Sequence, residues 1–278
     1  MRLTTREVKT NFIVALRSEA QAIIEQYAMR PMARHGAIRI YESPTVRLAI
    51  AGVGRTNAAT AVGYLGAHSS SDVNVWLNIG IAGHQHADLG QCFLVDKLTD
   101  GDTDVNYYPS ISFPSRLPSC ALRTVSRAEI DYPHPCLYDM EGAAFFNAAV
   151  QFSPPELVAL LKIVSDNKNN SIEKIDRDFI AKLVDDALED VNDLTSTLTE
   201  LAQQQVEVVD YSKLYIDIPW RVSESQRHQI NNLTRRLCSL DSNADPSAIL
   251  ARCKDAREGI QTLKEYLGGN RLTFNKNQ

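Results

Sequence analysis

Two acidic segments, far apart in the chain, have residue types that could act on a sugar or a base. Residues 139–144 (Asp-Met-Glu-Gly-Ala-Ala) are predicted to open a helix, because small and apolar residues follow Glu141 at helical spacing. Glu141 then lies in the first turn, near the positive end of the helix dipole. Ser165 and Asp166 follow an apolar run that reads as a strand, and ligands of α/β sheets bind at the carboxyl ends of strands. Each segment alone is a weak signal.

Together with a glycine-rich run at 78–83 (Asn-Ile-Gly-Ile-Ala-Gly), these segments resemble the nucleoside phosphorylase and nucleosidase superfamily, and within it the methylthioadenosine/S-adenosylhomocysteine nucleosidases. That family has a Gly-rich loop after a central strand, a Met-Glu-x-x-Ala helix start and a Ser-Asp strand end, in this order. Two further matches lie at 12–20 and 51–59. The resemblance extends from about residue 10 to about residue 204 and leaves the C-terminal remainder uncovered.

Release of a purine from a nucleoside needs a proton for the leaving base, stabilisation of an oxocarbenium-like sugar and a nucleophile, and carboxylates can serve all three needs. The resemblance implies that Asp166 protonates the base, that Glu141 holds the ribose 2′- and 3′-hydroxyls, and that Glu19 activates water. The other substrate-binding positions it implies are Met140, Ile81, Ala82, Gly83, Ser165 and Ile130. Without the resemblance, a helix-capping aspartate and two helix-dipole glutamates explain the same carboxylates.

The nucleophile is the main open alternative. Phosphorylases of the superfamily bind phosphate with an arginine and a serine around the Gly-rich loop, where this chain has Asn78 and Ile81. Loss of a guanidinium and a hydroxyl favours water, while Arg17 and Arg55 keep phosphorolysis as an alternative. Lys162 either supports the Asp166 region or is a snorkelling lysine on a strand. A nucleoside-binding or partner-binding protein without turnover is the third hypothesis.

The composition argues against several classes of partner. A formal charge of -5 and a pI near 5.7 leave no general attraction to nucleic acid or to an anionic membrane. No uninterrupted apolar run approaches the roughly 20 residues that span a bilayer. The five cysteines are scattered and show no CxxC spacing, which is typical of reduced thiols. We therefore expect a cytoplasmic protein with no nucleic-acid and no membrane partner.

No cofactor or metal is expected. The Gly52-Val53-Gly54 run starts like a dinucleotide fingerprint, but Asn57 stands where the third glycine belongs. His84 and His86 are two residues apart in a predicted loop, where histidines are more often hydrogen-bonded or exposed than metal ligands. The resemblance implies instead a small-molecule nucleoside substrate and a homodimer formed through the central helices.

The pattern of elements predicts an α/β fold, a three-layer α/β/α sandwich with a mixed central sheet. Strands are expected at 12–16, 37–41, 46–51, 73–79, 121–125 and 157–164, and helices at 18–27, 57–65, 141–150 and 171–203. Residues 99–118 read as a long loop, whose Tyr107, Tyr108 and Phe113 either wall a base pocket or pack the loop onto the core. The connection through Pro133 and Pro135 is shorter than in the resembling family.

The domain prediction is a catalytic domain at 1–204 and a helical extension at 205–278. Within the extension, 206–209 and 214–220 read as extended, and 223–240 and 246–267 as helices, the second capped by Asp245. These helices carry little apolar surface for a core of their own. We expect the extension to pack on the catalytic domain or on a partner subunit.

Overall fold

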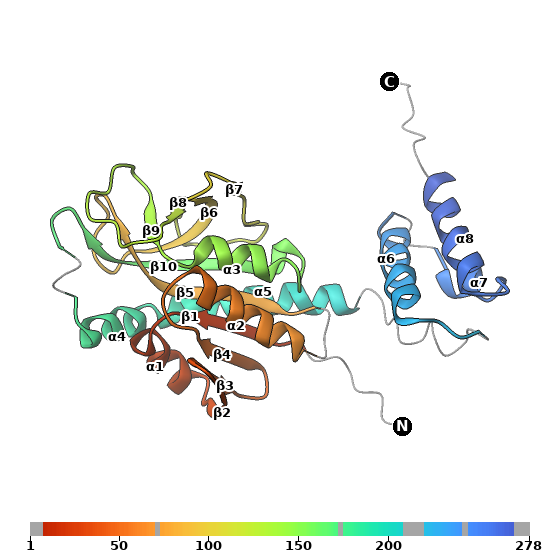
Figure 1. Cartoon of the computed structure of the whole chain (residues 1–278), viewed down its shortest axis with the longest axis horizontal. Helices are drawn as coiled ribbons and strands as arrows, with labels where there is room; N and C mark the ends of the chain where they lie inside the picture. The colour runs from red at the N-terminus through yellow and green to blue at the C-terminus, as the bar shows by residue number, and fades with distance from the viewer. Residues whose placement is uncertain (1–7, 70–72, 172–174, 208–219, 241–243, 270–278) are drawn as a thin grey trace, which may run out of the picture. The chain divides into compact units, whose positions relative to one another are not determined.

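In a computed structural model, residues 8–69, 73–171, 175–207, 220–240 and 244–269 are described (Figure 1). The chain divides into two compact units, Met1–Gln205 and Val206–Gln278. Of the extended segments predicted at 206–209 and 214–220, the first begins inside a helix. The rest of both, apart from Trp220, lies outside the described residues.

The first unit is built on one mixed sheet. Its strands are β1 (Thr10–Val14), β2 (Arg30–His35), β3 (Ile38–Glu42), β4 (Val46–Ile50), β5 (Val75–His84), β6 (Cys92–Asp100), β7 (Asn106–Tyr107), β8 (Ser119–Thr124), β9 (Leu137–Asp139) and β10 (Val158–Asn167). The central strands β1, β4, β5 and β10 pair in parallel, whereas β2, β3 and β4 form an antiparallel edge. Strand β5 pairs with β1, β10 and β9. Strand β10 also pairs with β6, β6 with β8, and β8 with β9, so these pairings form a closed ring that returns to β5.

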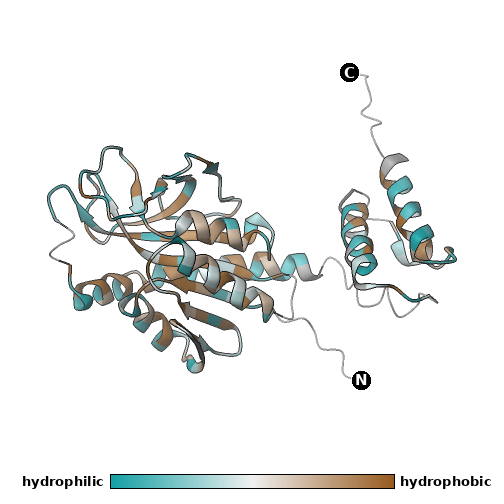
Figure 2. Ribbon diagram, in the orientation of Figure 1, coloured by the Kyte–Doolittle hydropathy of each residue, from teal (hydrophilic) through white to brown (hydrophobic). Residues whose placement is uncertain are grey.

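Helices cover both faces of this sheet, which confirms the predicted sandwich (Figure 1). They are α1 (Arg17–Gln26), α2 (Arg55–Ala67), α3 (Gly142–Ala149), α4 (Arg177–Asp186) and α5 (Leu188–Glu207), with a short 3-10 turn at Pro155–Leu157. Helices α1, α4 and α5 share one buried apolar cluster with alternate strand residues such as Leu77, while α2 and α3 share the other with Trp76. Both faces of the central strands are therefore apolar. In Figure 2 the colour of hydrophobic residues predominates in these strands.

The predicted helix at 171–203 is wrong as one element. The chain forms two helices, α4 and α5, with a turn at Ala187 between them. The N–H of Ala187 donates to Val184 O at 3.2 Å, a bond to the third preceding residue and not to the fourth as in an α-helix. Helix α4 starts at a cap, since Asp176 Oδ1 accepts the N–H of Phe179 at 2.8 Å. The apolar spacing runs through this turn without a glycine or proline to mark it.

Four strands lack a matching prediction, and their sequences explain why. Strand β2 (Arg-Pro-Met-Ala-Arg-His) has no apolar alternation because it lies at the edge of the sheet. Strand β9 has only three residues, and β6 changes its pairing register at a bulge near Asp96. Strand β7 lies within the segment predicted as a long loop.

The second unit contains α6 (Glu224–Leu240), α7 (Pro246–Leu250) and α8 (Ala256–Gly269). Its helices share a small buried cluster formed by Ile230, Leu237, Leu250, Ile260, Leu263 and Leu267. Asp245 caps α7, accepting the Ala248 N–H at 3.0 Å. The single helix predicted at 246–267 is wrong, because Asp255 starts a new helix by accepting the Glu258 N–H at 2.9 Å. Among the helices of the described residues, none is long and apolar enough to cross a membrane.

Candidate active site

A cavity of about 180 Å³ lies at the carboxyl ends of the parallel strands β1, β5 and β10, the edge where α/β sheets bind ligands, and β9 also contributes to its lining. It is lined by Ala15, Leu16, Glu19, Val53, Ile81, Ala82, Gly83, Val125, Ala128, Glu129, Tyr138, Asp139, Met140, Glu141, Ser165 and Asp166. The residues expected to act on the base, the sugar and the water thus reach one cavity from separate elements. None of these lining residues is arginine, lysine or histidine.

Asp166 lies beyond a bulge in β10, where the pairing with β5 shifts register between Val164 and Asp166. The extra residue, Ser165, re-aims the strand end, as bulges beside active sites do. The Ser165 hydroxyl donates to Asp166 Oδ1 and the Tyr132 hydroxyl to Oδ2. Asp166 is 2% exposed, and its carboxyl group is held in one orientation by two hydroxyl donors.

Glu141 is the residue before α3, one position earlier than predicted, and still lies at the helix N-terminus. Its Oε1 accepts the N–H of Gly54 at 2.6 Å. Gly54 adopts φ of +104° there, a conformation that favours glycine. Burial, with the nearby charge of Asp139, raises the pKa of Glu141 to about 7. Glu141 therefore changes between its protonated and its charged form near neutral pH.

Glu19 lies in the first turn of α1, and its carboxylate both caps this helix and joins it to the sheet. Oε2 accepts the N–H groups of Ala15 and Leu16 at 2.9 and 2.8 Å, and Oε1 accepts that of Ile81 at 3.0 Å. Burial raises the pKa of Glu19 despite these hydrogen bonds. Each carboxylate oxygen has two lone pairs, so Oε1 can accept one more donor from the cavity.

Lys162 is not a snorkelling lysine, since its side chain is 1% exposed in the middle of β10. Its Nζ pairs with Asp139 Oδ2 at 2.9 Å. Asp139 also accepts the Thr124 hydroxyl at 2.6 Å and the Gly142 N–H at 2.8 Å. Burial opposes the ammonium charge, yet Asp139, Glu141 and Glu19 together raise the pKa of Lys162. A permanent positive charge therefore lies beside the carboxylates of the site.

The expected binding residues Ile81, Ala82, Gly83, Met140 and Ser165 line the cavity. Ile130 does not, and its side chain is 66% exposed. The neighbouring carboxylate of Glu129 accepts the N–H groups of Ile130 and Asp131, both at 3.0 Å, in a local turn. The same segment reaches the cavity through Ala128 and Glu129 instead.

Arg17 and Arg55, the two arginines that left phosphate binding as an alternative, do not line the cavity. The guanidinium of Arg55 donates to Asp100 at 3.0 Å, to Thr124 O at 2.6 Å and to the Ser126 hydroxyl at 2.7 Å. Arg17 is exposed at the start of α1. The amide of Asn78 donates to the backbone of β1. These contacts leave the cavity without a guanidinium for an anion.

The histidines after β5 make backbone contacts. Nδ1 of His84 accepts the N–H groups of His86 and Ala87 at 3.0 and 2.8 Å, so this nitrogen carries no proton. The ring stacks on Phe93, and burial lowers the pKa of His84. Across the residues whose positions are given, no group of three or more His, Cys, Asp or Glu could hold a metal ion.

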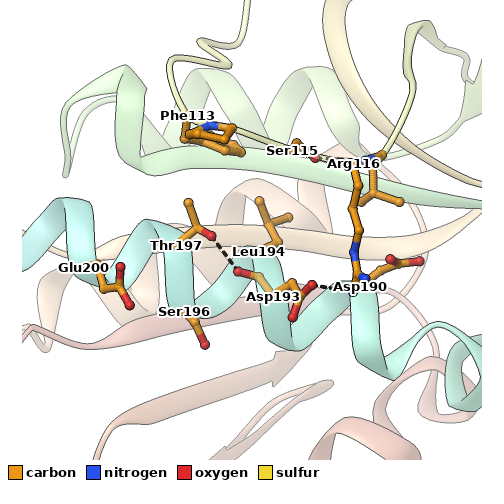
Figure 3. A pocket seen from close by; sticks show the side chains of 11 residues that line it. Phe113, Ser115, Arg116, Asp190, Asp193, Leu194, Ser196, Thr197 and Glu200 are labelled. Carbon is orange, nitrogen blue, oxygen red and sulfur yellow. Dashed lines mark hydrogen bonds and ion pairs between the residues drawn. The ribbon is translucent and has the colours of Figure 1, made fainter.

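A larger groove, of about 410 Å³, lies between the Phe113–Leu117 segment and α5 (Figure 3). Its Arg116 pairs with Glu189 at 2.8 Å and with Asp193, and the arginine side chain is 60% exposed. Exposed pairs of this kind contribute little free energy and are solvated. Phe113 lines this groove, Tyr107 packs on Phe146 and Tyr108 is exposed. The loop aromatics therefore do not wall the carboxylate cavity.

Three residues beside the carboxylates were missed or misassigned from sequence. A lysine inside an apolar strand run, Lys162, signals a buried acidic partner. The sequence does not say which acidic residue this is, and the structure shows that it is Asp139. Tyr132 offers no such signal, because it lies in an irregular connection rich in proline.

The sequence matches no protein-family model, and no curated protein is significantly similar to it. Solved structures are similar. The 5′-methylthioadenosine/S-adenosylhomocysteine nucleosidase from S. pneumoniae, with a transition-state inhibitor, is 18% identical with a TM-score of 0.57, covering 69% of this chain and 100% of its own. The 5′-methylthioadenosine nucleosidase of Arabidopsis thaliana gives 16% identity, a TM-score of 0.58 and coverage of 69% and 97%.

The futalosine hydrolase of Helicobacter pylori is a third similar structure, at 12% identity, a TM-score of 0.55 and coverage of 68% and 97%. The chain therefore has the nucleoside phosphorylase/nucleosidase fold, which confirms the fold that the resemblance in the motifs implies. At these identities the likeness establishes the fold, and the chemistry must be argued from the site.

Proposed function

We propose that the protein hydrolyses the N-glycosidic bond of a purine nucleoside or thionucleoside and releases the free base. The observation that carries this proposal is the convergence of Glu19, Glu141 and Asp166, each at most 8% exposed, on one cavity. Three carboxylates match the three needs of the reaction: an acid, a partner for the sugar and a base for water. The fold shared with nucleosidases supports the same assignment.

In the proposed reaction, Asp166 donates its proton to N7 of the base as the C1′–N9 bond breaks and the bonding electrons pass to the base. Positive charge then develops on the ribose, where carboxylates stabilise it. Glu141 accepts hydrogen bonds from the 2′- and 3′-hydroxyls, and Met140 packs on the sugar. Water forms the new bond to C1′ as Glu19 takes its proton.

Water is the proposed nucleophile because the cavity lining offers phosphate no cationic side chain, and Arg55 is held by its contacts to Asp100, Thr124 and Ser126. Loss of bidentate guanidinium contacts removes the strongest way to bind phosphate.

The test is a chromatographic assay of free base on a panel of purine nucleosides and thionucleosides, with and without inorganic phosphate. We expect release of base at the same rate in both conditions. Release that requires phosphate would make the protein a phosphorylase. Nucleoside binding without release would make it a binding protein of the same fold.

We further propose that the enzyme is a cytoplasmic homodimer. The free thiols of Cys92, Cys120 and Cys136 suit a reducing compartment, and the family resemblance supports dimerisation through the central helices. The mass in solution, measured by light scattering during gel filtration, tests the dimer. A monomer at working concentration would contradict it.

Replacing Glu141 with glutamine is expected to raise KM and to lower kcat for ribonucleosides, because the grip on the hydroxyls acts in both the ground and the transition state. Loss of a charge-assisted hydrogen bond corresponds to a decrease in kcat/KM of about tenfold or more. In the wild-type enzyme, 2′-deoxynucleosides should already react poorly. Equal rates for ribo and 2′-deoxy substrates would rule out this role of Glu141.

The raised pKa of Glu141 predicts a pH dependence of ribonucleoside binding. With a pKa of about 7, the carboxyl group is neutral below this pH and charged above it, and only the charged form makes the stronger bonds. KM is therefore expected to fall about fivefold as the pH rises from about 6 to about 8. The Glu141→Gln variant is the control and should show no such change. The same slope in both proteins would exclude Glu141 as its source.

A further inference from the structure

Tyr132 is buried beside the proposed acid in a conformation that its surroundings must impose. It is 2% exposed and adopts φ of +45°, which is an outlier for a bulky side chain. Its carbonyl oxygen accepts the side-chain amide of Gln85 at 2.9 Å. Its ring meets that of Tyr138 edge to face, with centroids 5.9 Å apart. Strained residues held in this way cluster at functional sites.

The hydroxyl of Tyr132 donates to Asp166 Oδ2 across 34 positions of sequence. This meeting requires the glycine at position 83. A Cβ there would lie 2.6 Å from both Tyr132 Cε1 and Asp166 Oδ2, closer than real Cβ contacts allow. Gly83 on β5 therefore leaves the space in which the phenol and the carboxyl group meet.

Tyr132 does not itself line the cavity, so it can affect the reaction only through its neighbours. Burial, with the hydrogen bond to Asp166, raises the pKa of Tyr132, so the phenol keeps its proton and remains a donor. Ser165 donates to the other oxygen of the same carboxyl group. The two hydroxyls together fix the plane of Asp166, which a single bond would leave free to rotate.

Tyr132 belongs to the connection between β8 and β9, and this connection also supplies Ala128 and Glu129 to the cavity. The bond from Tyr132 to Asp166 is therefore a link between the wall contributed by this segment and the strand end of β10. We propose that Tyr132 is a positioning residue that orients Asp166 toward the base and ties it to the wall formed by Ala128 and Glu129. This inference rests on the proposed function.

The test compares Tyr132→Phe with Asp166→Asn, with the double variant and with wild type in the base-release assay. We expect Tyr132→Phe to lower kcat about tenfold, in line with loss of a hydrogen bond to the carboxylate that forms as Asp166 gives up its proton, and to change KM less than about twofold. If Tyr132 acts only through Asp166, the double variant is no slower than Asp166→Asn alone.

Tyr27→Phe is the matched control, since this half-buried tyrosine loses a side-chain hydrogen bond to Thr195 away from the cavity. It should leave both kcat and KM unchanged. Gly83→Ala is a second variant, which should separate the phenol from the carboxyl group and lower kcat with the phenol intact. It keeps the inference testable if Tyr132→Phe fails to fold.

Several outcomes would overturn the inference. Unchanged kcat in Tyr132→Phe, or a double variant slower than Asp166→Asn by the full single effect, would show that Tyr132 is only structural. If either result is found while wild type releases base and Asp166→Asn does not, the inference on Tyr132 is wrong and the proposed function still holds. No release by wild type would remove the proposed function and the inference with it.

Discussion

Asp166→Asn is expected to abolish base release, with a loss of kcat of about 10²-fold or more, the range for a general acid. The amide keeps the shape of the side chain, but it has no acidic proton to give to the base. The buried site should tolerate the change, because the amide oxygen can still accept one of the two hydroxyl bonds from Ser165 and Tyr132.

Asp88→Asn is the matched control, since this exposed aspartate in the loop after β5 is absent from the cavity lining. Melting temperatures of both variants separate a catalytic loss from unfolding. Wild-type turnover in Asp166→Asn would remove this residue from the mechanism. An equal loss of kcat in both variants would show that the loss follows from removal of any aspartate charge and is not specific to Asp166.

The elements that bring Asp166 and Glu141 to the cavity could be predicted from the sequence because each depends on a local pattern. An apolar run that ends in Ser165-Asp166 predicts a buried strand with its polar end at the ligand-binding edge. Small and apolar residues after Glu141 predict the start of α3. Both predictions need only the periodicity of neighbouring residues. Strand β5 then brings the two segments together, because it pairs with β10, which ends in Asp166, and with β9, which leads into Glu141.

The contacts that shape the site join residues far apart in the sequence, and no local pattern predicts them. Gly54 N–H meets Glu141 across 87 positions, and the pair of Lys162 with Asp139 joins two different strands. A lysine on a strand is expected to reach solvent with its ammonium group. Lys162 is buried instead, because three carboxylates, those of Asp139, Glu141 and Glu19, stabilise its charge. Ile130 shows the same limit, since a turn at Glu129 decides which side of the segment faces the cavity.

Lys162→Met is expected to have the largest effect on stability. Both partners of the Lys162–Asp139 pair are 1% exposed, and removal of one partner leaves a buried charge without compensation, a cost of about 3–5 kcal/mol. Methionine fills much of the lysine volume, so the cost reflects charge more than packing. Activity should fall as well, because the ammonium lies beside Glu19 and Glu141, whose charges raise its own pKa.

The measurement is chemical unfolding of the full chain, followed by a signal from the first unit only. The positions of the two tryptophans make this possible. Trp76 is buried in the first unit and Trp220 belongs to the second, so a Trp220→Phe background lets Trp76 fluorescence report the catalytic unit. Lys168→Met, an exposed lysine just beyond β10, is the control and should change stability by less than about 0.5 kcal/mol.

A second substitution separates charge from packing at Lys162. Asp139→Asn in the Lys162→Met background removes the unpaired charge and keeps an oxygen to accept the Thr124 hydroxyl and the Gly142 N–H. Because replacement of a whole buried pair is often nearly neutral, the double variant should recover most of the lost free energy of unfolding. Additive losses in the double variant would show that the pair does not carry the stability of this site. A double variant that is stable but inactive would instead place the ammonium in the chemistry, as the charge that keeps Glu19 and Glu141 ready to bind.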